Sequence, residues 1–347
     1  MDLIVRAIDV GFGHTKYVKS SVPGSIECAH FPSLAYESAS DQATDGMGGK
    51  RRTVCIPVSG IYFEVGPEVE LAADNFTARQ LHDEYTKTPE YRALTAGALH
   101  YMKVPHVDLL VVGLPVAQYL AKRTELQKTM TGVFELGKKR QVEVRRTLVV
   151  AQPQGAMYCY FSDSAHQHDG RTKNLVIDAG SRTFDWLVAK GQRVMPKLSD
   201  SVNRGVSDIL NRVARALSAE LKEDYRNLEA IDAALRTGQP VRIHQRAHDL
   251  KKYDPLVQNI ADQAMGQVLA RLGPTDDVEN VVVVGGGAYL FRRAIKKRFP
   301  KIQIREVQEP MYANVRGFQM LGEQYVRENH AEFAGDRGVE TSPAVNA

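Results

Sequence analysis

The stretch RAIDVGFGHTK, Arg6 to Lys16, places an apolar strand, an acid, two glycines, a hydroxyl and a lysine within a few residues. The β-prone runs Leu3 to Asp9 and Thr15 to Lys19 flank a glycine turn, Gly11 to Gly13, so the stretch is predicted to form a hairpin. Glycines at such a bend let backbone N–H groups approach anionic oxygens, and the threonine and lysine add a hydroxyl and a positive charge. The stretch therefore suggests a site for a polyphosphate.

The second half of the chain repeats this pattern. KNLVIDAGSRTFDWLVAKG, which starts at Lys173, again contains a strand, an acid, a glycine, a threonine and a return strand. A third glycine cluster, VVVVGGGAYL, follows an apolar strand and precedes a helix. One glycine hairpin is commonly only a tight connection, but packing alone hardly explains three such elements in this order. The repeat indicates a duplicated architecture with a phosphate site.

Length and composition agree with this interpretation. A chain of 347 residues is longer than one hydrophobic core usually supports, which favours two domains with a ligand cleft between them. With 43% hydrophobic and 25% charged residues, the composition is that of an ordinary globular protein. The formal charge of +4 and the pI near 8.8 favour anionic ligands without indicating a nucleic-acid-binding protein.

Strands alternate with helices along both halves, which is typical of an α/β fold. In the first half, apolar residues recur at helical spacing after Pro89. In the second half we expect helices at Val206 to Leu221, Leu228 to Thr237 and Pro255 to Leu272, and a further one through Arg298. The expected units are a first domain over 1–160, with helix 311–330 packing back on it, a second domain over 161–310, a loop at Ser38 to Arg52 and a disordered tail at 332–347.

The cysteines and the N-terminus carry little functional signal. Cys28, Cys55 and Cys159 lack metal-binding spacing and are expected to be reduced packing residues. The start MDLIVRAIDV lacks the basic and long apolar regions of a secretion signal, and no run approaches the roughly 18 apolar residues of a membrane span. We therefore expect a cytoplasmic protein without membrane contact.

Two acids stand at equivalent places in the repeat, Asp9 and Asp178. A carboxylate beside phosphates repels them unless a cation lies between. Magnesium takes oxygen ligands and retains several waters. The two aspartates are therefore predicted to hold Mg²⁺, directly or through water.

The three glycine elements resemble the phosphate and adenosine loops of the actin, Hsp70 and sugar-kinase ATPases, over roughly residues 4–325. The segments DVGFGHTK, VVGLP, AQPQGAMY, DAGSRTFDW and VVVVGGGAY most resemble the ParM/StbA family of plasmid-segregating actin-like proteins. Protein D of the plasmid PRTRC systems is an equally similar relative. The resemblance implies an α/β, actin-like fold of two duplicated ribonuclease-H-like domains around a nucleotide cleft.

The resemblance also implies a nucleotide site built from these loops. Its implied residues are Asp9, Gly11, Gly13, Thr15 and Lys16 in the first phosphate loop, Asp178, Gly180, Ser181 and Thr183 in the second, Gly285, Gly286 and Gly287 along the adenosine, and Asn203 and Gly205 in VNRGVSDIL.

The family places a glutamate or glutamine after the strand that ends its first domain. Here Gln152 and Gln154 occupy that region, and both stay open as the residue that orients the attacking water, with Asp178 also at the catalytic centre. Phosphoryl transfer depends mainly on positioning and electrostatics. A glutamine can orient water but is a poor base, so slow turnover is expected.

Simpler roles are favoured for other residues near the motifs. Trp186, the only tryptophan, is expected in the core, and His14 is expected to have its hydrogen bonds satisfied or to face solvent rather than to touch a nucleotide. The basic runs GKKRQVEVRR and FRRAIKKRF are expected to be solvated faces, with subunit contacts left open.

The implied function is an ATPase that binds Mg-ATP, with GTP left open, and polymerises head to tail into dynamic filaments. The implied partners are further copies of the chain and a DNA-binding adaptor on a plasmid centromere, so no direct contact with nucleic acid is required. One alternative is a small-molecule, sugar-type kinase, for which no convincing acid motif is evident. Another is a non-polymerising Hsp70-like regulatory ATPase.

Overall fold

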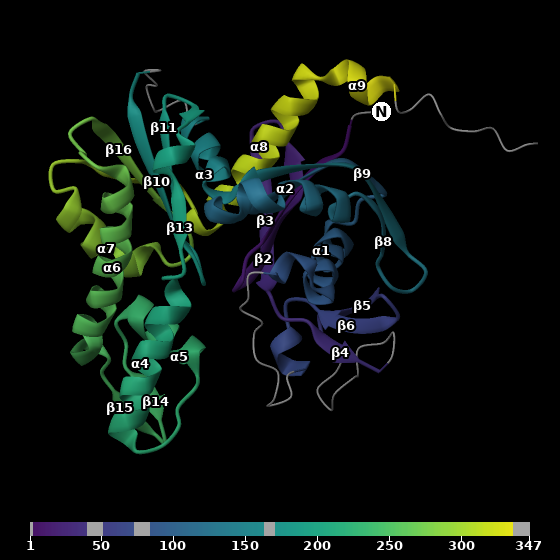
Figure 1. Cartoon of the computed structure of the whole chain (residues 1–347). Helices are drawn as coiled ribbons and strands as arrows, with labels where there is room; N and C mark the ends of the chain where they lie inside the picture. Colours follow the sequence, from purple (N-terminus) through teal and green to yellow (C-terminus); the bar gives the residue numbers. More distant parts are fainter. Residues whose placement is uncertain (1–2, 40–50, 73–83, 163–170, 336–347) are drawn as a thin grey trace, which may run out of the picture.

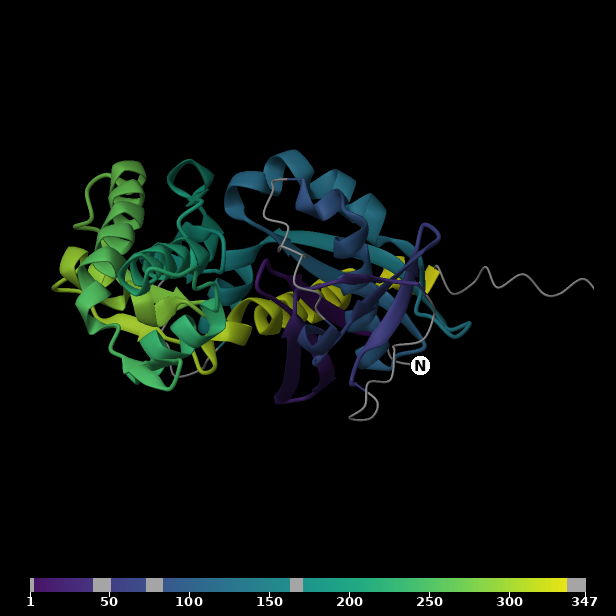
Figure 2. The same ribbon diagram turned by 90° about the horizontal axis from the view of Figure 1, so that it is seen from below.

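The computed structural model describes residues 3–39, 51–72, 84–162 and 171–335. Two α/β halves lie beside each other, and helices α3 and α8 run between them (Figure 1, Figure 2). The predicted α/β class is confirmed. Most of the predicted loop at 38–52, and the tail beyond residue 335, lie outside the described residues.

The first half contains a six-stranded sheet in the order β3-β2-β1-β7-β9-β8. The predicted opening hairpin is confirmed, with Asp9 opposite Lys16 in antiparallel register. β7 and β9 extend the sheet in parallel. The strands are β1 (Val5–Val10), β2 (His14–Val22), β3 (Ser25–Pro32), β7 (His106–Leu114), β8 (Gly132–Glu135) and β9 (Gln141–Ala151).

The second half repeats this topology in the order β12-β11-β10-β16-β17, and β13 pairs with β11. The second predicted hairpin is likewise confirmed, with Asp178 opposite Asp185. In each sheet a hairpin is followed by parallel strands, so the sequence repeat corresponds to a repeat of structure. The strands are β10 (Lys173–Ala179), β11 (Phe184–Lys190), β12 (Arg193–Val194), β13 (Asp200–Val202), β16 (Val278–Val284) and β17 (Ile304–Glu306).

Nine α-helices are present in the described ranges, and the helices expected from sequence periodicity are confirmed. They are α1 (Pro89–Met102), α2 (Val116–Met130), α3 (Gln152–Phe161), α4 (Val206–Leu221), α5 (Leu228–Thr237), α6 (Asp254–Leu272), α7 (Ala288–Arg298), α8 (Ala313–Glu328) and α9 (His330–Gly335). The duplication extends to them, because α2 and α7 follow the strands paired with β1 and β10, and α3 and α8 follow the next strands. Trp186 is 2% exposed in the second core, as expected.

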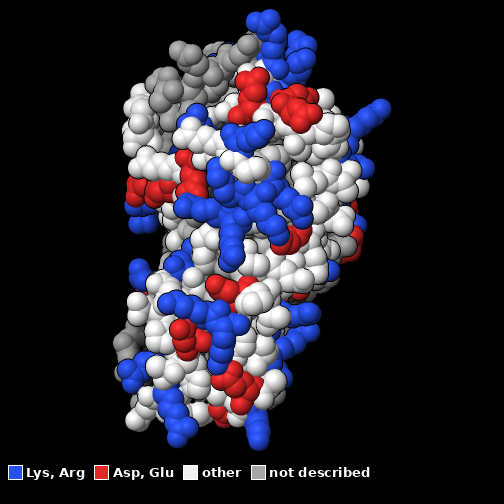
Figure 3. Space-filling view, turned by 90° about the vertical axis from the view of Figure 1, so that its left-hand side faces the viewer, with Lys and Arg blue, Asp and Glu red and all other residues white. Residues whose placement is uncertain are grey.

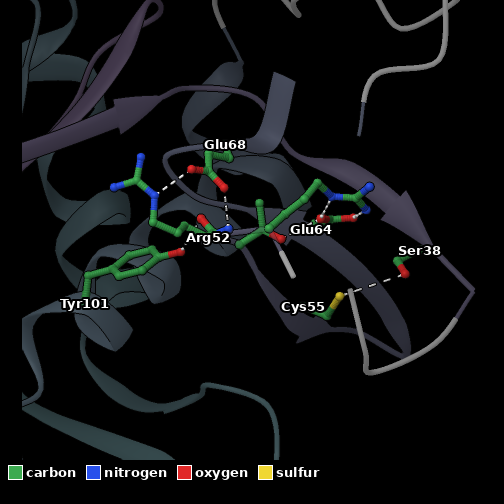
Figure 4. A network of polar contacts seen from close by, with 8 residues as sticks. Ser38, Arg52, Cys55, Glu64, Glu68 and Tyr101 are labelled. Atoms are coloured by element: carbon green, nitrogen blue, oxygen red, sulfur yellow. Dashed lines mark hydrogen bonds and ion pairs between the residues drawn. The ribbon is translucent and has the colours of Figure 1, made fainter. Parts of the chain in front are cut away.

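Two smaller sheets extend the halves at one end (Figure 1). In the first half these strands are β4 (Tyr36–Ser38), β5 (Val54–Val58) and β6 (Ile61–Val65), and in the second they are β14 (Val241–Ile243) and β15 (Arg246–His248). Figure 4 shows the polar network that fixes the first extension. Buried Glu64 accepts two hydrogen bonds of 3.1 Å from Arg51, and Tyr101 of α1 donates to the Arg52 carbonyl. The network ties the edge of this sheet to the first half.

The tail expectation is wrong at its start. Glu332 and Phe333 belong to α9, and Phe333 is 3% exposed. The Arg146 guanidinium lies 4.7 Å from the Phe333 ring centre and also hydrogen-bonds Glu332. One buried aromatic ring therefore anchors a segment whose composition is otherwise polar.

The basic run of α7 is an exposed face, as expected. Figure 3 views the molecule from the left of Figure 1 and shows Lys and Arg side chains gathered across the middle of this face. Two cations of the α7 run have carboxylate partners, Arg292 with Glu306 and Lys297 with Asp262. The exposed basic residues of the run are Arg292, Arg293, Lys296, Lys297 and Arg298.

The helices α3 and α8 cross at two glycines. A Cβ on Gly317 would overlap the carbonyl oxygen of Gly155, and one on Gly155 would overlap the carbonyl oxygen of Asn314. The backbones therefore touch without intervening side chains. Around the crossing, α8 packs on the first sheet through Val315 and Phe318, and α3 packs on the second through Ala156 and Met157.

The close contact at this crossing predicts that a methyl group added at Gly317 destabilises the fold. Gly317→Ala should lower the free energy of unfolding by about 1–3 kcal/mol, because the close-packed backbones must separate. Gly266→Ala, on α6 with nothing near its Cβ position, is the matched control and should stabilise by up to about 1 kcal/mol. Urea unfolding followed by circular dichroism measures both, and a Gly317→Ala protein as stable as wild type would contradict the crossing.

Candidate functional site

A cavity of about 390 Å³ lies between the two halves, within the range typical of small-molecule sites. The first hairpin contributes Asp9 and Lys16, and the second contributes Asp178 and Thr183. Helix α5 closes a further part of the wall. The two glycine hairpins therefore meet at one cavity, although they are far apart in the sequence.

The two hairpin turns have the same local geometry. The Gly11 N–H donates to the His14 carbonyl at 3.2 Å, and the Gly180 N–H donates to the Thr183 carbonyl at 3.0 Å. The turns also approach each other, since a Cβ on Gly13 would lie 3.0 Å from the Cβ of Ser181. Backbone rather than bulky side chains therefore lines this part of the cavity, as close approach to an anion requires.

The third glycine element joins β16 to α7. Gly285 has φ +88°, and a side chain there would collide with Asp178. Gly286 and Gly287 line the cavity immediately before the first residue of α7. Since a helix N-terminus carries partial positive charge, this position favours an anionic group.

The facing aspartates are each held by an amide from a following helix. Gln152, the first residue of α3, donates to Asp9 at 2.8 Å, and Asn314, near the start of α8, donates to Asp178 at 2.6 Å. Asp9 also pairs with Lys16 at 3.1 Å. The structural duplication thus includes the polar contacts at the cavity.

The electrostatics of the two aspartates differ because only Asp9 has an ion-pair partner in the described contacts. Burial, together with the negative charges of Asp185 and Asp9, raises the pKa of Asp178 to about 7, against 3.8 for a free aspartate. Burial also raises the pKa of Asp185. A nearby cation would favour the ionised form of a carboxyl group whose pKa is raised in this way.

Not every predicted site residue lines the cavity. Thr15 is buried and shares a 2.9 Å hydrogen bond with Ser33. Gln154 accepts a hydrogen bond from the Ala151 N–H, so it caps its own helix. Gly205 packs under the second turn, with its N–H donating to the Arg182 carbonyl, and Asn203 is exposed outside the cavity lining.

The remaining predicted residues come together at the cavity wall. They are Asp9, Gly11, Gly13, Lys16, Gln152, Asp178, Gly180, Ser181, Thr183, Gly285, Gly286 and Gly287. His14 is exposed and also lines the cavity.

Sequence reasoning missed several lining residues. Asn314 carries no local signal except its place two residues into a helix, and Val206 and Ser207 stand just after the predicted Gly205. On α5, Asp232 accepts from Tyr289 at 2.7 Å and pairs with Arg236 at 3.0 Å, and Arg236 donates to the Gly286 carbonyl. This cluster fixes α5 against the third glycine element.

The comparisons with known proteins agree with this geometry. Residues 7–155 match the family "Actin like proteins N terminal domain", and residues 176–297 match "Archaeal actin homologue MreB-like, C-terminal". The two models match successive parts of the chain, one in each half. The predicted actin-like fold is confirmed.

Solved structures share this fold at low identity. The archaeal actin homologue Ta0583 is 23% identical with a TM-score of 0.77, and its ADP complex is 21% identical with a TM-score of 0.76; both comparisons cover 93% of this chain and 100% of that chain. A subunit of a 15-stranded ParM filament from Clostridium botulinum is 17% identical with a TM-score of 0.72 at the same coverage. A search of curated protein sequences gave no significant match. Within the described ranges, no helix combines the length and apolar character of a membrane span.

The raised pKa of Asp178 predicts a pH-dependent stability in the absence of divalent cations. Between about pH 4 and pH 7 the unfolded chain has lost this proton and the folded chain retains it, so the free energy of unfolding falls as pH rises. The slope approaches about 1.4 kcal/mol per pH unit. Asp178→Asn removes this contribution.

Urea unfolding of both proteins in EDTA across this range measures the effect. The stability of Asp178→Asn relative to wild type should therefore rise with pH. Parallel stability curves for the two proteins would show that Asp178 ionises normally in the folded state.

Proposed function

We propose that this chain is an ATPase that binds Mg-ATP between its halves and polymerises into dynamic filaments. The observation that carries the proposal is the convergence of two duplicated glycine hairpins, each with a buried aspartate, on one cavity. The complex of a similar fold with ADP supports a nucleotide as the ligand. GTP remains an alternative to ATP.

The residues present fit a nucleotide with a divalent cation. Lys16 and the glycine backbones supply positive charge and close approach to phosphates, and Asp9 and Asp178 supply carboxylate oxygens of the kind that Mg²⁺ prefers. Burial and the charges of Asp185 and Asp9 raise the pKa of Asp178, which disfavours its ionised form when no cation is bound. A bound cation would neutralise phosphate charge and favour that ionised form.

Gln152 is the better candidate of the two glutamines for orienting the attacking water. Gln152 lines the cavity and its side chain hydrogen-bonds Asp9, whereas the Gln154 side-chain oxygen accepts a hydrogen bond from the Ala151 N–H at the start of α3. An amide positions water by hydrogen bonding without acting as a strong base. We therefore expect slow hydrolysis, which suits a filament whose subunits hydrolyse their nucleotide after assembly.

Polymerisation rests on the neighbours of this fold. They include a ParM filament, the actin-like protein Alp7A and an Alp12 filament. Head-to-tail contacts between identical subunits extend without closing and give filaments. We assign the chain to the ParM/StbA or PRTRC protein D branch, with a DNA-binding adaptor on a plasmid centromere as the cytoplasmic partner.

Light scattering tests this proposal directly. On addition of Mg-ATP, scattering by the purified protein should rise and then decay as phosphate is released, because hydrolysis weakens subunit contacts. EDTA should abolish both signals. ADP formation without phosphate release or scattering, and only with an added sugar or metabolite that becomes phosphorylated, would instead identify a kinase of the same fold.

The two glutamines provide a second test. Gln152→Ala should slow phosphate release on the order of 100-fold, the loss typical of a misplaced reacting group, while nucleotide binding persists. Gln154→Ala should leave the hydrolysis rate within a few fold and act mainly on thermal stability. Equal loss of hydrolysis in both variants would contradict the assignment to Gln152.

A further inference from the structure

Helix α2 begins without a cap from its own half. Its N-cap residue, Pro115, has no side-chain donor or acceptor, so the first N–H groups of the helix need partners elsewhere. Helix α2 packs on the first sheet through Leu126 and Met130. The helix therefore belongs physically to the first half of the molecule.

The second half supplies the missing cap. The Val116 N–H donates to the Asp185 carboxylate at 2.9 Å, and the Ala117 N–H donates to the Ser201 hydroxyl at 3.0 Å. The Ser201 hydroxyl in turn donates to Asp185. Asp185 stands on β11 and Ser201 on β13, both in the second sheet. Hydrogen bonds thus join the two halves at a point separate from the chain connections.

Asp185 and Lys16 occupy equivalent positions in the two hairpins but have different surroundings. In the first hairpin, the residue opposite Asp9 is Lys16, which lines the cavity, while in the second hairpin the residue opposite Asp178 is Asp185. Asp185 is 1% exposed and does not line the cavity. Its buried charge is costly unless it is hydrogen-bonded, and the α2 N-terminus provides those bonds.

The same contacts reach the cavity on both sides. Thr183, in the second turn, hydrogen-bonds Asp185, and Thr183 itself lines the cavity. On the other side, Gly113, Leu114 and Pro115 line the cavity immediately before α2. A change in the second turn can therefore reach the start of α2 through one carboxylate.

From these contacts we propose that Asp185 and Ser201 form a latch that holds the two halves closed over the ligand by capping α2 from across the cleft. Asp185 is thus a positioning residue, coupled to the ligand through Thr183. The kinetic part of this inference rests on the proposed nucleotide binding. Loss of the latch leaves each half folded, opens the cleft and speeds release of bound nucleotide.

Asp108 offers a matched control. It is also a buried carboxylate, and it accepts hydrogen bonds from the Ile4 N–H at 2.7 Å and from Arg145 at 2.9 Å. All three residues lie in the first half. Asp108→Ala therefore imposes a comparable loss of buried hydrogen bonds without touching the contact between halves.

The first measurement needs no nucleotide. Spin labels on exposed Thr124 of α2 and Gln267 of α6, both changed to Cys in a background without native cysteines, report the distance between halves by double electron–electron resonance. Asp185→Ala and the milder Ser201→Ala should shift the distribution to longer distances, and Asp108→Ala should not. Wild-type distributions in both latch variants, or an equal shift in Asp108→Ala, overturn the latch.

The second measurement follows release of a fluorescent ADP by stopped flow. Ser201→Ala and Asp185→Ala should speed release by about tenfold, equivalent to about 1.4 kcal/mol and the size of one helix cap. Asp108→Ala should release nucleotide at the wild-type rate even where its melting temperature falls. Release unchanged in the latch variants overturns the coupling. A wild-type protein that binds no nucleotide would refute the proposed function, while the spin-label distances would still decide whether the latch exists.

Discussion

Two buried aspartates that face one cavity constrain how the surrounding helices are placed. Asp9 and Asp178 are nearly inaccessible to water, so each requires a polar partner. The amide of Gln152 serves one and the amide of Asn314 the other, and both amides come from the first turn of a helix. The positions of α3 and α8 are thus tied to the chemistry of the cavity as well as to the packing of the cores.

The two hairpins differ at the residue that stands opposite the buried aspartate. Lys16 gives the first hairpin a cation, whereas the equivalent residue of the second hairpin is the acid Asp185. Lys16 lines the cavity, whereas Asp185 lies outside its lining, so the cavity wall has a cation at this position in one half only. The two halves thus share a hairpin scaffold and differ in charge at this position.

Local sequence predicted the features that depend on local chemistry. The glycine turns follow from backbone freedom, and the strands and helices around them follow from apolar spacing. What escaped prediction depends on distant partners. The spacing of AQPQGA does not show that Gln152 reaches Asp9 while Gln154 turns back to Ala151, and the sequence around Thr15 does not show that Ser33 takes its hydroxyl.

Residues contributed by other elements were equally invisible to the sequence patterns. Asn314 and the α5 residues Asp232 and Arg236 line the cavity only because α8 and α5, which are distant in the sequence from the first hairpin, fold against it. Phe333 shows the same limit at the chain end, where one ring packed against Arg146 orders a polar segment. Composition averages over residues, and it therefore misses a single anchor.

The glycine crossing is a close backbone contact between α3 and α8, the two helices that run between the halves. Gly155 and Gly317 meet backbone to backbone, and the Phe318 ring packs beside Gly155. The extensions that carry β4 to β6 and β14 to β15 project away from it on both halves (Figure 1). The displacement that a small rotation produces increases with distance from the crossing. Any change at the cavity that turned one half relative to the other about this crossing would therefore be largest at the ends of the two extensions.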